Sequence, residues 1–162
     1  DKDMSVLKNT SIVGAFCLLL IVMMTAQARA DNVRKGGILI EAPWARASIG
    51  MSRPAAAYLS IRNAGDEPVI LIKVSTPVSE MAEIHESTMS DGTARMGPAG
   101  DLVIPAGSEV VLMPGGLHIM MMKLKQPLIK GDKFNMTLIF KEIGTVDVQL
   151  PVLGVGASGP TN

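Results

Sequence analysis

Residues 82–96 read AEIHESTMSDGTARM, two short runs of alternating apolar and polar side chains on either side of Asp91-Gly92. This dipeptide is a strong signal for a two-residue β-hairpin turn, because Asp and Gly tolerate the positive φ angles that such a turn needs. The turn also sets the register, pairing Ser90 with Thr93 and Ser87 with Met96. The segment therefore predicts an antiparallel hairpin.

The rest of the chain repeats this rhythm, with turn residues between short runs rich in Val, Ile and Leu. Such spacing is typical of a sandwich or barrel, and no stretch of a dozen residues has a convincing helical period. We expect an all-β domain with at most one helical turn. The predicted strands are residues 38–42, 56–62, 69–74, 82–88, 93–96, 109–113, 118–124, 133–142 and 146–151.

The N-terminal segment has the features of an export signal. Lys8 follows a start at Met4, residues 12–24 form a short apolar core, and Ala28-Arg29-Ala30 places small residues at both cleavage positions. We expect cleavage after Ala30, a single domain over residues 31–153, and a disordered polar tail over residues 154–162. The apolar core is shorter than the roughly 20 residues of a membrane span, so stable membrane insertion after cleavage is not expected.

Removal of residues 1–30 changes the chemistry available to the protein, because the only cysteine, Cys17, lies in that segment. A mature chain without a thiol has no cysteine nucleophile, no disulfide and no blue-copper ligand set. Its 12 basic and 13 acidic residues give no electrostatic attraction for nucleic acid or anionic lipid. About 130 residues fit one compact domain.

The two histidines of the chain, His85 and His118, each have a methionine nearby in strand register. His85 shares a sheet face with Met96 as a diagonal cross-strand neighbour, roughly 7 to 8 Å away. His118 and Met120 stand at i and i+2 on a strand, on one face and about 6.5 Å apart. Thioether sulfur combined with neutral imidazole favours Cu(I) over harder divalent ions. Two such pairs facing a common point would supply four ligands to one copper ion.

A methionine in an aliphatic strand is most often core filler. That interpretation is given to Met81, Met113, Met121 and Met136, and aromatic packing is predicted for Trp44 and Tyr58. Met89 and Met122 share strand faces with the proposed ligands, so they are either accessory ligands or packing residues. Catalysis is not expected, because with both histidines engaged no usual general base is left for a serine nucleophile.

The spacing of the four site residues resembles the copper-binding signature of the periplasmic copper chaperones usually written PCu(A)C. Ten residues separate His85 from Met96, twenty-one separate Met96 from His118, and one separates His118 from Met120. The resemblance extends over residues 38–152, through the segments PWAR (43–46), AAAY (55–58), AEIHE (82–86), IPAG (104–107), PGGLHIM (114–120) and LKQPL (124–128).

This resemblance implies a cupredoxin-like Greek-key β-barrel with one Cu(I) bound at His85, Met96, His118 and Met120. We also expect a monomer, exported to the periplasm by the N-terminal signal. The resemblance further implies that copper is delivered to the binuclear copper centre of cytochrome c oxidase, directly or together with a thiol-dependent Sco-type partner. Some members carry a tail rich in His and Met for Cu(II), whereas residues 154–162 contain neither.

Two alternatives remain beside this hypothesis. A copper electron-transfer protein on the same fold would turn intensely blue when Cu(II) is added, although the absence of a mature cysteine argues against it. A metal-free β-sandwich that binds a protein or glycan would be purified without metal from copper-supplemented cells.

Overall fold

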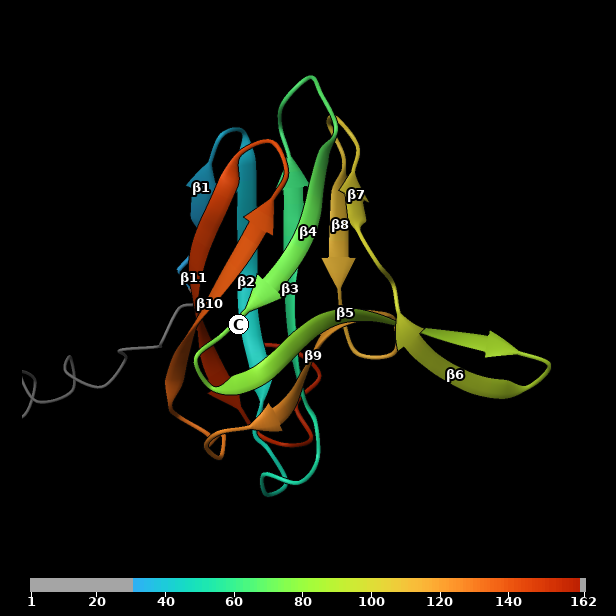
Figure 1. Ribbon diagram of the computed structural model, residues 1–162, viewed down its shortest axis with the longest axis vertical. Coiled ribbons are helices and arrows are strands. Elements are labelled where there is room, and N and C mark those ends of the chain that lie inside the picture. Colours follow the sequence, from blue (N-terminus) through green and yellow to red (C-terminus); the bar gives the residue numbers. More distant parts are fainter. Residues whose placement is uncertain (1–30, 161–162) are drawn as a thin grey trace, which may run out of the picture.

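The structure, a computed structural model, describes residues 31–160, which form eleven β-strands and no helix (Figure 1). The all-β prediction is confirmed. The strands are β1 (Val33–Lys35), β2 (Ile38–Arg46), β3 (Ala55–Asn63), β4 (Val69–Ser75), β5 (Ser79–Ser90), β6 (Thr93–Pro98), β7 (Leu102–Ile104), β8 (Glu109–Leu112), β9 (Leu117–Leu124), β10 (Lys133–Phe140) and β11 (Gly144–Leu153). None of the described residues belongs to a helix able to span a membrane. The predicted signal peptide, with Cys17, lies outside the described residues.

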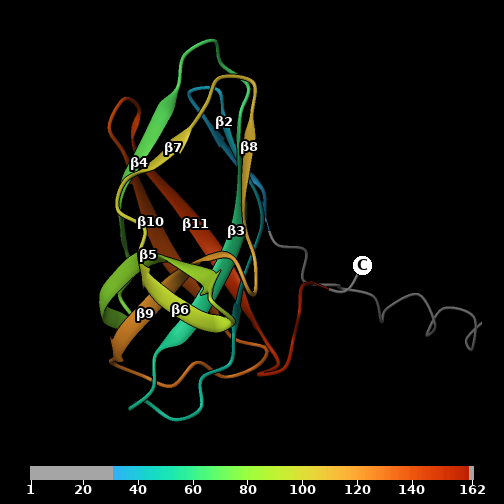
Figure 2. The same ribbon diagram turned by 90° about the vertical axis from the view of Figure 1, so that its right-hand side faces the viewer.

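The strands are joined in one open sheet that folds into two layers (Figure 2). One layer holds β1, β2, β3, β8, β9, β5 and β6, and the other holds β11, β10, β4 and β7. Strand β11 connects the layers. It pairs with β10 along most of its length, and its last residues, Val152 and Leu153, then pair in parallel with Ala45 and Arg46 of β2.

Aliphatic side chains fill the space between the layers, as the low aromatic content of the chain requires. The largest fully buried side chains are Ile38, Ile40, Ile61, Leu71, Ile104, Ile119, Met121, Met136, Leu138, Phe140, Leu150 and Val152. Trp44 and Tyr58 are a buried cross-strand pair with ring centroids 4.4 Å apart, which confirms their packing role.

All nine predicted strands are present, and two short ones, β1 and β7, were not predicted. Each has three residues, too few to show an alternating pattern, and each is held by a longer neighbour. The disorder predicted for residues 154–162 stays a prediction, although Ala157 accepts a 2.8 Å hydrogen bond from Arg46 Nε.

The core-filler interpretation is confirmed for Met121 and Met136 and is wrong for Met81 and Met113, whose exposed fractions are 41% and 54%. Met81 projects from the outer face of β5, and Met113 follows the end of β8 beside the turn at residues 114–116. For Met81 the strand face, which the surrounding sequence leaves ambiguous, decides the burial of the side chain. Met113 is exposed because β8 ends one residue earlier, at Leu112.

Truncation of Met121 should show how much the core beneath the outer face of β9 contributes to stability. We expect Met121→Ala to lower the free energy of unfolding by about 2 to 5 kcal/mol, because a fully buried side chain leaves a cavity. Met89→Ala is the matched control. Met89 is 72% exposed, so its loss should change stability by about 0.5 kcal/mol or less. Urea unfolding measures both, and equal effects would contradict the described core.

Candidate metal centre

Strands β5 and β9 pair antiparallel so that His85 lies directly opposite His118. Directly opposite residues project from the same face of a sheet, so both imidazoles are on one face. Their neighbours Ile84 and Ile119 alternate to the other face and are buried in the core. The structure thus brings together the two histidines that the sequence singled out.

Two more pairs continue along the same face, Glu83 opposite Met120 and then Met81 opposite Met122. We call the three pairs the donor ladder, since five of the six side chains carry imidazole nitrogen or thioether sulfur. The ladder ends at Lys123, whose left-handed backbone (φ 53°) breaks the alternation of β9. Leu124 is consequently buried rather than exposed beside Met122.

The hairpin of β5 and β6 has the predicted register, with Ser87 opposite Met96 and Ser90 opposite Thr93. Asp91 and Gly92 form the turn with positive φ angles of 51° and 74°. Met96 therefore lies on the same face as His85, as its diagonal neighbour, while its side chain is 55% exposed. Figure 1 shows that this hairpin extends beyond the body of the molecule.

The two imidazole rings have centroids 6.0 Å apart and planes inclined by 53°. Two metal–nitrogen bonds of about 2 Å each fit within that separation, one on either side of a single ion. His118 is buried, and the His85 side chain is only 12% exposed. Water therefore has little access to the inner side of this pair.

Hydrogen bonds determine which nitrogen of each neutral ring carries the proton. His118 Nδ1 lies 2.9 Å from the carbonyl oxygen of Gly116, which only accepts, so Nδ1 donates and Nε2 keeps its lone pair. His85 Nε2 lies 3.3 Å from Glu83 Oε2, so in His85 the lone pair remains on Nδ1. The two rings thus present different nitrogens to a ligand.

His85 Nδ1 is buried and has no hydrogen-bond partner. Every other buried side-chain nitrogen or oxygen in residues 31–160 has one. An unsatisfied buried polar group costs about 1 to 3 kcal/mol, so it calls for an explanation. A metal ion bound to the lone pair of Nδ1 would supply the missing partner. The geometry therefore fits a metal centre at the two histidines.

Within the described residues, no group of three or more His, Cys, Asp or Glu side chains could hold a metal ion. Beside the two imidazoles, the donors on this face are the methionine thioethers and the carboxylate of Glu83. The partly buried Met120 and the exposed Met96 lie on the required face. Copper(I) is the ion that such a donor set favours.

Sequence reasoning did not find three residues of this region. Glu83 and Gly116 orient the imidazoles, and Met81 completes the last pair of the donor ladder. The alternation His118, Met120, Met122 was visible in the sequence, but its partner strand and register were not. The role of Gly116 depends on a carbonyl oxygen, which leaves no sequence signal.

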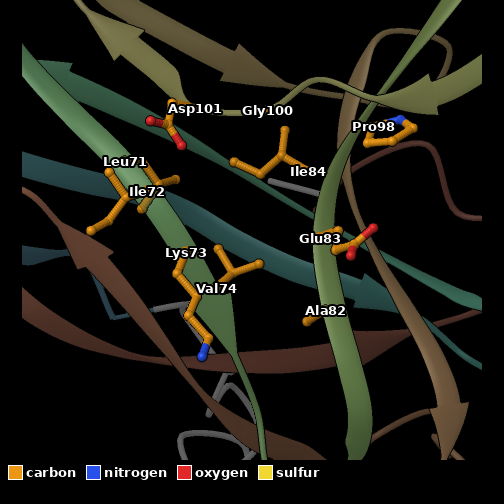
Figure 3. A pocket seen from close by; sticks show the side chains of 10 residues that line it. All are labelled: Leu71, Ile72, Lys73, Val74, Ala82, Glu83, Ile84, Pro98, Gly100 and Asp101. Atoms are coloured by element: carbon orange, nitrogen blue, oxygen red, sulfur yellow. The ribbon is translucent and has the colours of Figure 1, made fainter.

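A cavity of about 330 Å³ lies apart from the imidazoles, between β4 and β5. Figure 3 shows Ala82 and Ile84 directed toward this gap, whereas Glu83 projects from the other side of β5. The cavity therefore opens on the core side of β5, opposite to the donor ladder, and is not the candidate metal centre.

Comparison with known proteins gives one family and several related structures. The profile of the LpqE-like family, described as "Putative lipoprotein LpqE-like", matches residues 38–152. The protein named "Putative lipoprotein Lxx21020" from Leifsonia xyli subsp. xyli is 33% identical over 133 residues, which cover 81% of this chain and 78% of that protein.

Two solved structures are also similar. The apo PCuAC domain of PmoF2 has a TM-score of 0.68 and 25% identity, with coverage of 80% of this chain and 100% of that domain. The solution structure of Cu(I)-bound DR1885 from Deinococcus radiodurans has a TM-score of 0.55 and 28% identity, with coverage of 82% and 85%. The cupredoxin-like fold expected from the sequence agrees with these neighbours.

The assignment of the imidazole protons can be tested without metal. At pH 8.5, nitrogen-15 NMR of the apo protein should show the proton on Nε2 of His85 and on Nδ1 of His118, because only these nitrogens face acceptors. Glu83→Ala should shift His85 toward a mixture of tautomers and leave His118 unchanged. Finding the His85 proton on Nδ1 in the unaltered protein would contradict the assignment.

Proposed function

Because the chain belongs to the LpqE-like family, which is the family of PCuAC domains, we propose that it is a copper chaperone that binds one Cu(I) and passes it to another protein. The observation that carries the proposal is the buried, unpartnered Nδ1 of His85 beside His118. Copper-bound forms of two similar proteins, the PmoF2 domain and DR1885, support the identity of the ion.

The proposed ligands are His85 through Nδ1, His118 through Nε2, and the sulfur atoms of Met96 and Met120. The hydrogen bonds to Glu83 and Gly116 support the choice of nitrogens, because each one fixes the proton on the far side of its ring. The register of β5 with β6 and β9 supports the choice of sulfurs. The Met sulfurs remain neutral and unprotonated when they bind.

This ligand set would favour Cu(I) over divalent ions, because its donors include soft sulfur atoms and carry no charge. Four neutral donors give little stabilisation to a hard divalent ion, whereas polarizable sulfur suits Cu(I). The carboxylate of Glu83 lies outside the donor set but next to His85, where its hydrogen bond fixes the orientation of the ring. The site would thus hold a cuprous ion without a permanently charged ligand.

Release of copper would proceed by stepwise exchange of ligands. Met96 is more than half exposed and sits on the edge strand β6, in the hairpin that extends from the body. An incoming thiolate, being anionic and soft, would displace this thioether first. The buried His118 would release copper last. No bond is made or broken within the polypeptide and copper keeps its oxidation state, so we propose transfer without catalysis.

The proposed recipient is the binuclear copper centre of cytochrome c oxidase, reached directly or through a Sco-type thiol protein. The proposed location is the periplasm. Support comes from the signal-like residues 1–30 and from the word lipoprotein in the name of the Leifsonia relative. The electron-transfer alternative has less support, because residues 31–162 contain no cysteine.

Competition with a Cu(I) chelator tests the ligand assignment. The variant His85→Ala with His118→Ala should bind Cu(I) at least about tenfold more weakly, a loss of about 1.4 kcal/mol or more, because two of four ligands are removed. Met51→Leu is the matched control, since Met51 is 49% exposed in the loop between β2 and β3. Unchanged affinity in the double variant would show that the histidines do not bind copper.

Transfer can be followed by mixing the Cu(I)-loaded protein with the soluble apo domain that carries the oxidase copper centre, with and without a reduced Sco-type protein. We expect the visible absorption of the binuclear centre to appear, after oxidation, in at least one mixture. Met96→Leu should alter the transfer rate more than Met51→Leu, which removes an exposed thioether from the loop between β2 and β3. Copper that stays on the chaperone in both mixtures would exclude these recipients.

A further inference from the structure

The last pair of the donor ladder, Met81 on β5 and Met122 on β9, has no role in the proposed four-ligand centre. The two residues are directly opposite and project from one face. Residues in this relation have Cβ atoms about 4.5 to 5.5 Å apart, and two flexible thioether side chains at that distance can reach a common ion. The pair therefore has the geometry of a soft-metal site.

Burial does not explain why these positions are methionine. Met81 is 41% exposed and Met122 is partly exposed, whereas Met121 between the ladder positions of β9 is fully buried. A side chain that stays in contact with water gains only part of the hydrophobic stabilisation of a core residue. The exposed pair is thus set apart from the methionines that fill the core.

The charged side chains around the pair are of both signs. Glu83 follows Met81 on the same face of β5. The nearby Lys123 is ion-paired with Glu80, at 3.4 Å between Nζ and Oε2. Met81 also borders a solvent-open cavity of about 270 Å³, whose lining includes Lys73 together with Glu80 and Glu83. Around the pair the two carboxylates, Glu80 and Glu83, are thus matched by two lysines, Lys73 and Lys123, so an ion at Met81 and Met122 would be held by the thioethers themselves.

We propose that Met81 and Met122 form a second, weaker Cu(I) site, to which Met120 can contribute a third thioether. Met120 and Met122 stand at i and i+2 on β9 and on the same face, about 6.5 Å apart. Because Met120 also belongs to the proposed four-ligand centre, it stands between the two sites, and Met81 and Met122 lie two ladder positions from His85 and His118. The second site goes beyond the proposed function, and its existence does not depend on the histidines.

The test is a titration of the full mature protein, labelled with carbon-13 at the methionine methyl groups, with Cu(I) under anaerobic conditions. We expect the first equivalent to shift the methyl signals of Met96 and Met120, and a second equivalent to shift those of Met81 and Met122. The variant Met81→Leu with Met122→Leu should lose the second equivalent and keep the first, because leucine conserves volume but offers no donor. Met51→Leu, in the loop between β2 and β3, should keep both.

The variant His85→Ala with His118→Ala separates this proposal from the proposed function. In it the methyl signals of Met81 and Met122 should still shift with Cu(I), even though tight binding is lost. Methyl signals that stay in place at five equivalents of Cu(I), or a second equivalent that persists in the leucine variant, would overturn the second site. Should the double leucine variant fail to fold, Met81→Leu alone, at an exposed position, should lower the affinity for the second equivalent of Cu(I) at least tenfold. Unchanged affinity in that variant would also overturn the second site.

Discussion

The antiparallel register between β5 and β9 is the constraint on which the candidate site depends. It sets His85 opposite His118 and aligns Glu83, Met120, Met81 and Met122 behind them on the outer face. A slip of β5 by one residue would turn His85, Glu83 and Met81 toward the core and bring Ile84 to the surface. That exchange would remove buried apolar area, so the packing of the core holds the donor atoms in place. The stability of the fold and the geometry of the site are therefore set by the same pairing.

The site combines rigid and exposed elements in a way that suits a carrier. The imidazoles are shielded from water and oriented by a backbone carbonyl and a carboxylate, which reduces the reorganisation needed when copper binds. Met96, by contrast, is exposed to water, in a hairpin that extends from the body and lies at the edge of the sheet (Figure 1). An ion held between these elements has strong contacts on its inner side and an approach for a second protein on its outer side.

Local patterns predicted much of the fold. Alternation and turn residues located nine strands, and Asp91-Gly92 gave the register of the hairpin of β5 and β6, because a two-residue turn leaves little freedom. Strands β1 and β7 are held by neighbours distant in sequence, which no local pattern contains. The four proposed ligands were also found from spacing. The pairing of β5 with β9 was not, so Met81 was misread as core and the orienting roles of Glu83 and Gly116 were missed.

X-ray absorption at the copper edge, on protein loaded with one equivalent of Cu(I), tests the central claim most directly. Two nitrogen and two sulfur neighbours are expected around a single cuprous ion, with one nitrogen fewer in His85→Ala. A coordination sphere of sulfur alone, or one that contains no sulfur, would contradict the assignment of the histidines and methionines to one centre.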